Sequence, residues 1–309
     1  MSDAVPYSAQ HATGVGSVPG ADPRSAIWAT ARGELALDRP RIMGILNVTP
    51  DSFWDGDRHA GVDAALRQAE RLVSEGADLV DVGGESTRPG AEPVDGAEER
   101  GRVVPVVESL VREWPDLLVS VDTVKAEVAR SALEAGAAVV NDVSGFRLDP
   151  SLPGVCAEAS AGVVLMHSRG GVGEMASYAM ADYGADPVAE IVADLGAADA
   201  RAIDAGIDAA AIVLDPGLGF SKRTEESVAA IAGLDRLRSL GRPVLLGPSR
   251  KRFVGELAGG LPAEERLPGT IAACVAGLLA GARLFRVHDV APVRRALAVA
   301  EAVVEGVSA

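Results

Sequence analysis

The 309-residue sequence predicts an α/β fold, a single (β/α)8 TIM barrel. Short apolar runs rich in Val, Ile and Leu lack the alternation of a half-buried strand, which indicates a parallel sheet buried on both faces. Helical segments separate these runs, and several joints share one pattern, in which a glycine such as Gly76 or Gly136 follows a predicted helix end. Eight strand-and-helix units in a chain of this length favour a barrel.

The predicted strands are eight apolar runs of similar length. They cover residues 42–47, 78–82, 118–122, 138–141, 162–166, 211–215, 243–247 and 283–287. The predicted helices follow these strands, near residues 61–75, 97–113, 125–135, 151–159, 186–205, 224–239, 266–280 and 290–305. The fifth helix has a clear start, because Asp186 can cap it and Pro187 suits the first helical position.

The first 40 residues differ from the repeated units. Residues 1–25 are rich in Ser, Gly, Ala and Pro and show no signal-peptide pattern, so we predict a disordered N-terminal arm. We expect residues 26–40 to form a short N-terminal hairpin or plug at the base of the barrel, within one domain of residues 26–309. An open doubly wound sheet is the alternative fold, but the Gly-rich phosphate turn expected after its first strand is missing.

The acidic composition narrows the classes of partner. The formal net charge is −15 and the pI is about 4.7, which disfavours binding to nucleic acid or to an anionic membrane. The longest stretch of small apolar residues, 270–282, is too short to span a bilayer. The two cysteines, Cys156 and Cys274, form no metal or redox motif, so we predict a reducing, cytoplasmic location.

Each predicted strand ends in a polar or ionisable residue, and a barrel brings these strand ends to one mouth. In chain order the residues are Asn47, Asp81, Asp122, Asn141 with Asp142, His167, Asp215, Ser249 with Arg250 and Lys251, and Arg286 with His288. A single residue of this kind is more often a cap or a turn residue than part of a site. Eight together indicate a functional site at the mouth.

The residue types at the mouth indicate its ligand. Asp122, Asn141 and Asp215 offer two carboxylates and an amide, which suit a planar heterocycle with adjacent N–H donors. A second set is cationic or rich in donors and suits a phosphate or pyrophosphate: Arg88, Lys251, Arg286 and His288. The amide oxygen of Asn47 is a candidate ligand for Mg2+, which prefers few protein ligands together with phosphate oxygens.

Other chemistries fit the sequence less well. The four histidines never pair as H-x-H, which disfavours a zinc hydrolase. No G-x-S-x-G segment occurs, and neither cysteine is placed like a nucleophile. We therefore predict catalysis by positioning and electrostatics, without a covalent enzyme intermediate.

Eight segments of the chain resemble the dihydropteroate synthases, the folate-pathway enzymes that sulfonamides inhibit. The two longest and most specific are residues 43–53 (MGILNVTPDSF) and 81–90 (DVGGESTRPG). Shorter matches follow in family order: 120–123 (SVDT), 140–143 (VNDV), 165–167 (LMH), 214–217 (LDPG), 249–251 (SRK) and 286–289 (RVHD). The resemblance covers the chain from about residue 40 to its C-terminus.

The resemblance implies a reaction and a set of site residues. The amine of 4-aminobenzoate would displace pyrophosphate from 6-hydroxymethyl-7,8-dihydropterin diphosphate to give 7,8-dihydropteroate. The pterin would lie deep in the barrel, on Asp122, Asn141, Asp215, Lys251 and Arg286. The pyrophosphate would contact Asn47, Arg88, Arg286 and His288, with Mg2+ on Asn47. The catalytic residues would be Asp122, Lys251, Arg88, Asn47 and His288.

The resemblance also implies two mobile loops that close over the aminobenzoate. The pocket and its loops would include Thr49, Pro50, Asp51, Phe53, Ser86, Thr87, Pro89, Ser249 and Arg250. The sequence departs from the family pattern at residues 168–175, where many members have a Met-Gln-Gly type loop, and at residues 219–224, where one extra residue precedes the Thr. The roles of His167 and Lys222 are therefore left open.

The family usually forms dimers, so we expect a homodimer, and sulfonamides are expected competitive inhibitors. The small residues of the helix near 266–280 would permit a close approach of two subunits. Two alternatives are a pterin-dependent methyltransferase and a catalytically silent pterin-binding paralogue. The first would not need residues 85–90 or 249–251, and the second should have lost loop residues such as Arg88, yet all of these are present.

Overall fold

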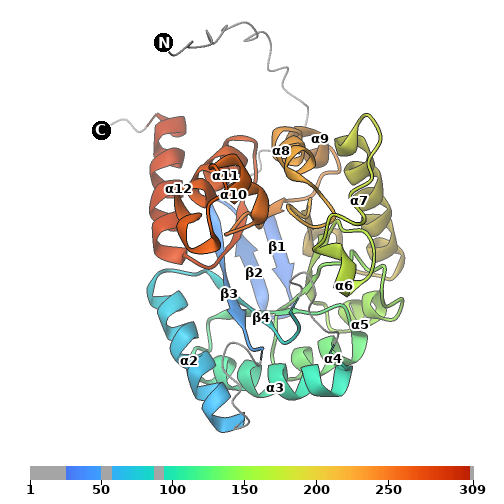
Figure 1. The fold of residues 1–309 in the computed structure, drawn as a ribbon. Coiled ribbons are helices and arrows are strands. Elements are labelled where there is room, and N and C mark those ends of the chain that lie inside the picture. The colour runs from blue at the N-terminus through green and yellow to red at the C-terminus, as the bar shows by residue number, and fades with distance from the viewer. Residues whose placement is uncertain (1–25, 50–57, 87–93, 307–309) are drawn as a thin grey trace, which may run out of the picture.

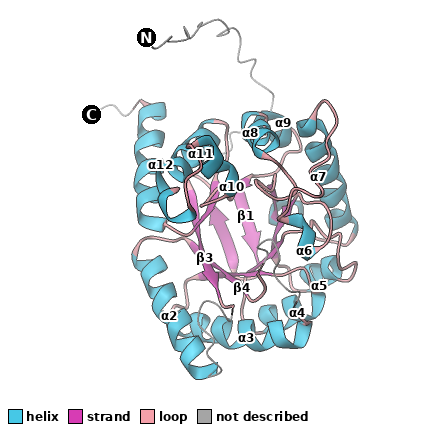
Figure 2. Cartoon of the chain, in the orientation of Figure 1, coloured by secondary structure: helices cyan, strands magenta, loops and turns pink. Residues whose placement is uncertain are grey.

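Eight parallel strands form one curved sheet in the computed structural model, which describes residues 26–49, 58–86 and 94–306 (Figures 1 and 2). The strands are β3 (Arg41–Asn47), β4 (Leu79–Gly83), β5 (Leu118–Asp122), β6 (Val139–Asp142), β7 (Gly162–Met166), β8 (Ile212–Asp215), β9 (Leu245–Leu246) and β10 (Leu284–Val287). They pair in the order β8-β7-β6-β5-β4-β3-β10-β9. A parallel bridge between Leu214 and Val244 joins the two ends of this order, so the predicted (β/α)8 barrel is confirmed.

Helices surround the sheet as an outer ring (Figure 1). They are α2 (Arg58–Ser74), α3 (Gly96–Glu113), α4 (Ala126–Glu134), α5 (Leu152–Glu158), α6 (Val172–Met175), α7 (Pro187–Asp204), α8 (Thr224–Ala232), α9 (Leu234–Arg238), α10 (Arg252–Leu257), α11 (Leu267–Leu279) and α12 (Val290–Glu305), with 3-10 turns η2 (Ala209–Ala211) and η3 (Ala263–Glu265). No helix in the described ranges is both long enough and apolar enough to cross a membrane.

The helix expected over residues 224–239 is two helices, α8 and α9, which meet at Gly233. A Cβ atom at Gly233 would lie 2.7 Å from the Val188 side chain at the start of α7, so this close approach requires glycine. The short helices α6 and α10 were not predicted, because four to six residues are too few to show a helical period.

The side chains inside the barrel change from apolar to polar along the strands. In β4, Val80 and Val82 pack in the cluster beneath the helices, while Leu79 packs in a second cluster inside the barrel. Side chains alternate along a strand, so Asp81 and Gly83 follow Leu79 on the inner face. The inner cluster takes one residue from most strands and forms the floor: Met43, Leu79, Val139, Val164, Val213, Leu245 and Leu284. The next inner positions toward the C-terminal strand ends are polar on β4, β6, β8 and β10, at Asp81, Asn141, Asp215 and Arg286. On β3 and β7 these positions are Ile45 and Met166.

A two-stranded hairpin closes the floor from below. It consists of β1 (Ile27–Thr30) and β2 (Gly33–Ala36), paired antiparallel. Trp28 is fully buried in the floor cluster, and its indole N–H donates to the carbonyl of Ala211 at 2.9 Å. This confirms the predicted hairpin or plug, whereas the arm predicted for residues 1–25 lies outside the described residues. The plug leaves the opposite end of the barrel as the open one.

Candidate active site

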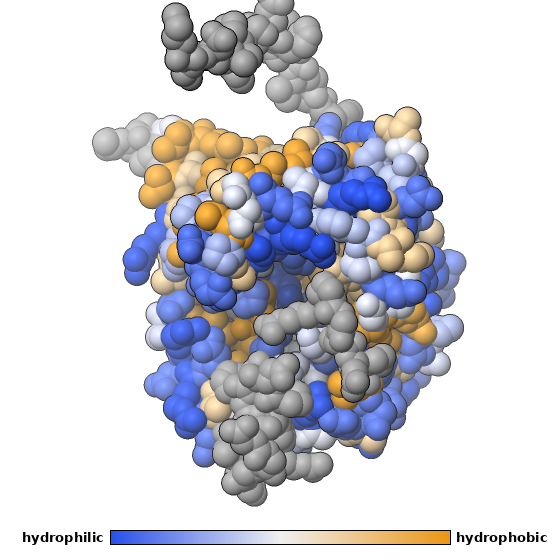
Figure 3. Space-filling view, viewed as in Figure 1, coloured by the Kyte–Doolittle hydropathy of each residue, from blue (hydrophilic) through white to orange (hydrophobic). Residues whose placement is uncertain are grey.

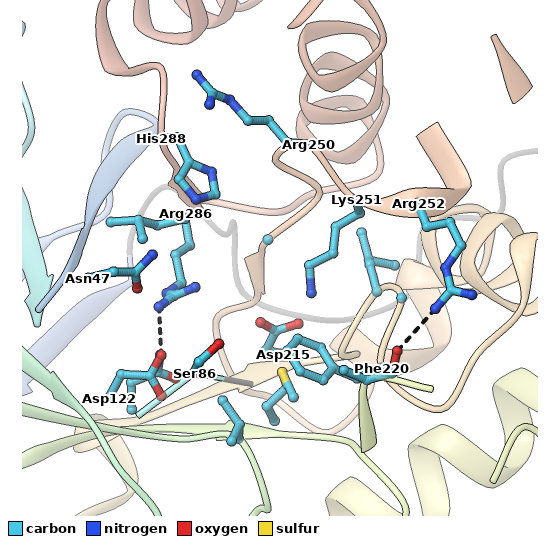
Figure 4. A pocket seen from close by; sticks show the side chains of 18 of the residues that line it. Asn47, Ser86, Asp122, Asp215, Phe220, Arg250, Lys251, Arg252, Arg286 and His288 are labelled. Carbon is cyan, nitrogen blue, oxygen red and sulfur yellow. Dashed lines mark hydrogen bonds and ion pairs between the residues drawn. The ribbon is translucent and has the colours of Figure 1, made fainter. Parts of the chain in front are cut away.

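A cavity of about 520 Å3 opens at the C-terminal ends of the strands, on the face where hydrophilic residues gather beside α10 (Figure 3). Ten of its lining residues are labelled in Figure 4: Asn47, Ser86, Asp122, Asp215, Phe220, Arg250, Lys251, Arg252, Arg286 and His288. Ile45, Thr49, Glu85, Asn141, Val143 and Met166 also line it. The barrel thus brings together residues that lie up to 243 positions apart, from Ile45 to His288.

Arg286 joins two carboxylates on one side of the cavity. Its Nε donates to Asp81 and its Nη2 donates to Asp122, each at 2.6 Å. Asp81 is fully buried and also accepts hydrogen bonds from Ser120 at 2.6 Å and from the Asn141 side-chain amide at 3.0 Å. Asp81 therefore orients both Arg286 and Asn141 from beneath the cavity.

Burial and charge compete at Asp122. Removal from water raises the pKa of the Asp122 carboxyl to about 7, although the Arg286 guanidinium opposes the rise. For Arg286 the two carboxylates outweigh burial and raise the pKa of the guanidinium. Arg286 remains a cation, and Asp122 can exchange a proton near neutral pH.

Asp215 and Lys251 line the opposite side, from the end of β8 and the turn before α10. Burial raises the pKa of Asp215. The backbone N–H of Gly217 donates to the Asp215 carboxylate at 2.7 Å and opposes this rise. Burial lowers the pKa of Lys251 to about 7, and Asp215 opposes that change. The Lys251 ammonium position is 3.6 Å from the centre of the Phe220 ring, so a cation and an aromatic face stand together here.

Asn47 and Asp122 face each other across Gly83, because β4 pairs Gly83 with Asn47 on one side and with Asp122 on the other. A Cβ atom at Gly83 would lie 3.6 Å from the Asn47 amide oxygen and 3.8 Å from a carboxylate oxygen of Asp122. The missing side chain leaves room beside two oxygen ligands of the kind Mg2+ prefers. Within the described ranges, no group of three His, Cys, Asp or Glu side chains is placed to hold a metal ion.

His288 and Ser249 form a pair at the upper edge of the cavity. The Ser249 hydroxyl lies 2.9 Å from His288 Nδ1 and accepts the His288 backbone N–H at 3.1 Å. Burial lowers the pKa of His288 to about 4, and the nearby Arg286 acts in the same direction. His288 is therefore neutral at pH 7 and can act as a hydrogen-bonding group. Ser249 supports His288 and is itself not part of the cavity wall.

Arg250 points away from Lys251 (Figure 4) and forms a two-fold ion pair with Asp289, at 2.9 and 2.7 Å. Its charge is thus already matched by a carboxylate at the rim. Thr49 and Ser86 line the cavity. The other residues predicted for the loops lie outside the described residues: Pro50, Asp51, Phe53, Thr87, Arg88 and Pro89.

Phe220, Arg252 and Arg266 line the cavity but were not predicted as site residues. Asp81 was predicted at the mouth as a strand-end residue, but its contact with Arg286 was not predicted. Phe220 forms an aromatic wall, but its loop departs from the family pattern. Arg252 and Arg266 line the cavity from α10 and from the residue before α11, and no motif marks them.

The described residues of the site offer two kinds of chemistry. Carboxylates and an amide at Asp122, Asn141 and Asp215 can accept from the N–H groups of a flat, donor-rich ring. The space beside Asn47, with Arg286 and His288 above it, can take an anionic group. A ring held at the first set and a leaving group held at the second fit one substrate.

The chain is similar in sequence and in fold to several known proteins. Residues 43–288 match the family described as "Pterin binding enzyme". A dihydropteroate synthase of Bacillus subtilis is 43% identical over 258 residues, which cover 84% of this chain and 86% of that protein. The structure of a Xanthomonas albilineans dihydropteroate synthase with 4-aminobenzoic acid is 48% identical, covers 87% and 95% of the two chains and has a TM-score of 0.80. The Yersinia pestis enzyme in a sulfonamide complex is 39% identical, covers 90% and 99%, and has a TM-score of 0.83.

Proposed function

The chain belongs to the dihydropteroate synthase family of pterin binding enzymes, and from this premise we propose how its barrel mouth carries out the family's reaction in folate biosynthesis. The reaction condenses 6-hydroxymethyl-7,8-dihydropterin diphosphate with 4-aminobenzoate and releases pyrophosphate. The observation that carries the proposal is the convergence of Asp122, Asn141, Asp215 and Lys251 on one cavity of about 520 Å3. This volume suits a small-molecule substrate.

The pterin is proposed to bind to the polar residues inside the barrel mouth, here called the inner polar layer: Asp122, Asn141, Asp215 and Lys251. Asp122 and Asp215 accept from its amino group and ring N–H groups, and Asn141 supplies a further amide beside them. Lys251 donates to the ring's carbonyl side, and Phe220, beneath Lys251, offers a flat surface for the ring. Arg286 stands at the face of the ring and is fixed there by Asp81 and Asp122.

The pyrophosphate end lies toward Asn47, His288 and Arg286, with Arg88 as a further proposed contact. The Asn47 amide oxygen would hold Mg2+ together with oxygens of the substrate. When bound, Mg2+ would offset the negative charge that the leaving pyrophosphate acquires. His288 donates a hydrogen bond from Nε2 if its Nδ1 accepts from the Ser249 hydroxyl.

The bond changes need no covalent enzyme intermediate. The C–O bond to the pyrophosphate breaks first, the electron pair leaves with the pyrophosphate, and a pterin-stabilised cation remains. The aminobenzoate nitrogen then forms the new C–N bond and loses a proton to the released pyrophosphate or to solvent. Carboxylates at Asp122 and Asp215 stabilise the cation, and the cationic side of the cavity stabilises the anion.

The aminobenzoate is proposed to bind beside Thr49 and Ser86, which line the cavity. The proposed mobile loops around these residues would exclude water, which could otherwise capture the cation. Sulfonamides share the amine-bearing ring of 4-aminobenzoate, so we propose that they compete with it at this chain, as the sulfonamide complex of the Yersinia pestis relative suggests.

A homodimer is supported by an apolar surface over α11 and α12, which is orange in Figure 3. Leu279 on α11 and Val299, Val303 and Val304 on α12 are each more than 60% exposed. Val299 and Val303 are four residues apart and so share one face of α12. Light scattering should give a mass near twice 31.6 kDa, and a mass near 31.6 kDa would refute the dimer.

We also propose a cytoplasmic location, supported by two cysteines that are both free and buried. Fractionation of the native host would check this proposal.

The reaction is tested by release of pyrophosphate from the two substrates with Mg2+. We expect release that requires aminobenzoate, with 7,8-dihydropteroate formed in equal amount. A methyltransferase or a silent binding protein would release none. Pyrophosphate release without aminobenzoate would instead indicate a hydrolase.

A further inference from the structure

Lysine is rare in this chain and confined to the barrel mouth. The sequence has 29 Lys and Arg residues, of which only Lys125, Lys222 and Lys251 are lysines. Lys251 lines the cavity, and Lys125 bridges Glu85 and Glu99 at its edge. Lys222 is fully buried in the β8–α8 loop. It neither lines the cavity nor takes part in the Lys125 ion pairs. Lysine offers a compact tetrahedral amine, which differs from the planar guanidinium of the arginines that supply most of the cations in this chain.

The Lys222 amine is surrounded by hydrogen-bond acceptors. It lies 2.7 Å from His167 Nδ1, 3.1 Å from the Phe220 carbonyl, 3.2 Å from the Gly217 carbonyl and 3.4 Å from the His167 carbonyl. A tetrahedral amine can donate in three directions, whereas a planar guanidinium cannot converge on these atoms. No carboxylate in the described part of the chain forms an ion pair with Lys222.

His167 is set to accept from Lys222. Its Nε2 lies 3.0 Å from the Asp194 carboxylate on α7, which accepts the ring proton and leaves Nδ1 as the acceptor. Burial, and next the positive Lys222, lower the pKa of His167 to about 4, so the ring is neutral at pH 7. Burial also lowers the pKa of Lys222, and either protonation state of the amine has a proton to donate to His167.

The contacts of Lys222 fix a turn that forms part of the pterin pocket. Gly217, whose carbonyl accepts from Lys222, also donates its N–H to the Asp215 carboxylate at 2.7 Å. Phe220, whose carbonyl accepts from Lys222, carries the ring that lies 3.6 Å beneath Lys251. Gly217 has φ +69°, and a Cβ atom there would lie 2.0 Å from the His167 carbonyl, so the turn is held tightly against the end of β7.

We propose that Lys222 is a positioning residue for the pterin, because its amine, held by His167, fixes the Gly217–Phe220 turn and thereby orients Asp215 and Phe220. The inference rests on the proposed function and names a residue that contacts no substrate. It predicts that the Lys222–His167 contact controls pterin affinity and leaves the aminobenzoate step nearly unchanged, since Thr49 and Ser86 lie on other loops.

The test measures binding of 6-hydroxymethylpterin by fluorescence, together with the two KM values from pyrophosphate release. Lys222→Met keeps the length of the side chain and removes its donors, so we expect at least tenfold weaker pterin binding and a higher KM for the pterin substrate. The KM for aminobenzoate at saturating pterin should change less than threefold. If both affinities fall alike, or neither falls, the proposal is overturned.

A second pair of variants tests the same contact should Lys222→Met fail to fold. His167→Asn places an amide oxygen near the position of Nδ1, and His167→Leu removes the acceptor. We expect His167→Asn to retain pterin affinity within threefold, and His167→Leu to lose at least tenfold. Equal affinity in these two variants contradicts the proposal. Wild-type protein in the same assay separates the claims, because failure of the wild type to bind the pterin would refute the proposed function itself.

Discussion

Arg286 on β10 and Asp122 on β5 meet across the mouth of the barrel, with Nη2 and Oδ2 2.6 Å apart. Their strands are not neighbours in the sheet, so the contact spans the cavity interior. The same guanidinium also holds Asp81, and through Asp81 it is linked to Asn141. One arginine therefore ties together two of the groups proposed to bind the pterin.

Asp122→Asn should reduce kcat/KM for the pterin substrate by about a hundredfold, because it removes a charge that stabilises the developing cation. Arg286 would keep Asp81 as its carboxylate partner, so the barrel should still fold. Asp199→Asn is a matched control, because Asp199 pairs with Arg242 at 2.7 Å away from the cavity lining. Near-normal turnover in Asp122→Asn would remove Asp122 from the mechanism.

Asn47→Ala should raise the Mg2+ concentration needed for half-maximal activity by about tenfold, because the protein loses its proposed ligand oxygen. Asn47→Asp keeps an oxygen at this position and should not raise the Mg2+ requirement. A titration of activity against Mg2+ compares the two variants. Identical Mg2+ dependence in wild type and Asn47→Ala would place the ion elsewhere.

Lys251 should make the free protein gain stability as the pH rises from 7 to 9. Burial lowers the folded-state pKa of Lys251 to about 7 from its usual 10.5, so in this range the unfolded state holds more protons than the folded state. Stability therefore rises with pH, by about 2 kcal/mol over two pH units. Lys251→Met lacks this contribution, and urea unfolding at both pH values should show it. Parallel pH curves for the two proteins would contradict the shift.

Trp28→Ala should lower the free energy of unfolding by about 3–5 kcal/mol, because it leaves a cavity in the barrel floor and removes the bond to Ala211. The floor lies at the opposite end from the cavity, so the KM values of the folded variant should stay within twofold of the wild type. Urea denaturation and steady-state kinetics measure the two effects. A large KM change with normal stability would show that the plug shapes the site.

The sequence was sufficient to predict the barrel fold and the polar residues at the strand ends. Apolar runs and glycine helix ends repeat along the chain, and a parallel barrel converts their order into position, so Asn47, Asp122 and Asp215 could be placed at one mouth. The hairpin was also predicted, from its place before the first strand, and Trp28 and Leu37 of the predicted segment pack in the floor cluster.

Contacts between distant residues could not be read from the sequence. Arg250 pairs with Asp289, 39 residues away, because of the way the loop before α10 turns. The sequence predicts Arg250 for the aminobenzoate pocket but does not show this carboxylate partner. The role of Asp81 depends on Arg286, 205 residues away. The need for glycine at position 233 comes from the close approach of Val188 from another helix. Each of these features is set by tertiary packing.

The central claim is that the inner polar layer of the barrel binds the pterin, and a crystal structure with the pterin diphosphate and a sulfonamide tests it most directly. We predict that the amino edge of the ring lies within hydrogen-bonding distance of Asp122 and Asp215, with the pyrophosphate beside Asn47 and His288. A pterin ring bound outside this cavity, or one bound there with its amino edge turned away from both carboxylates, would contradict the account.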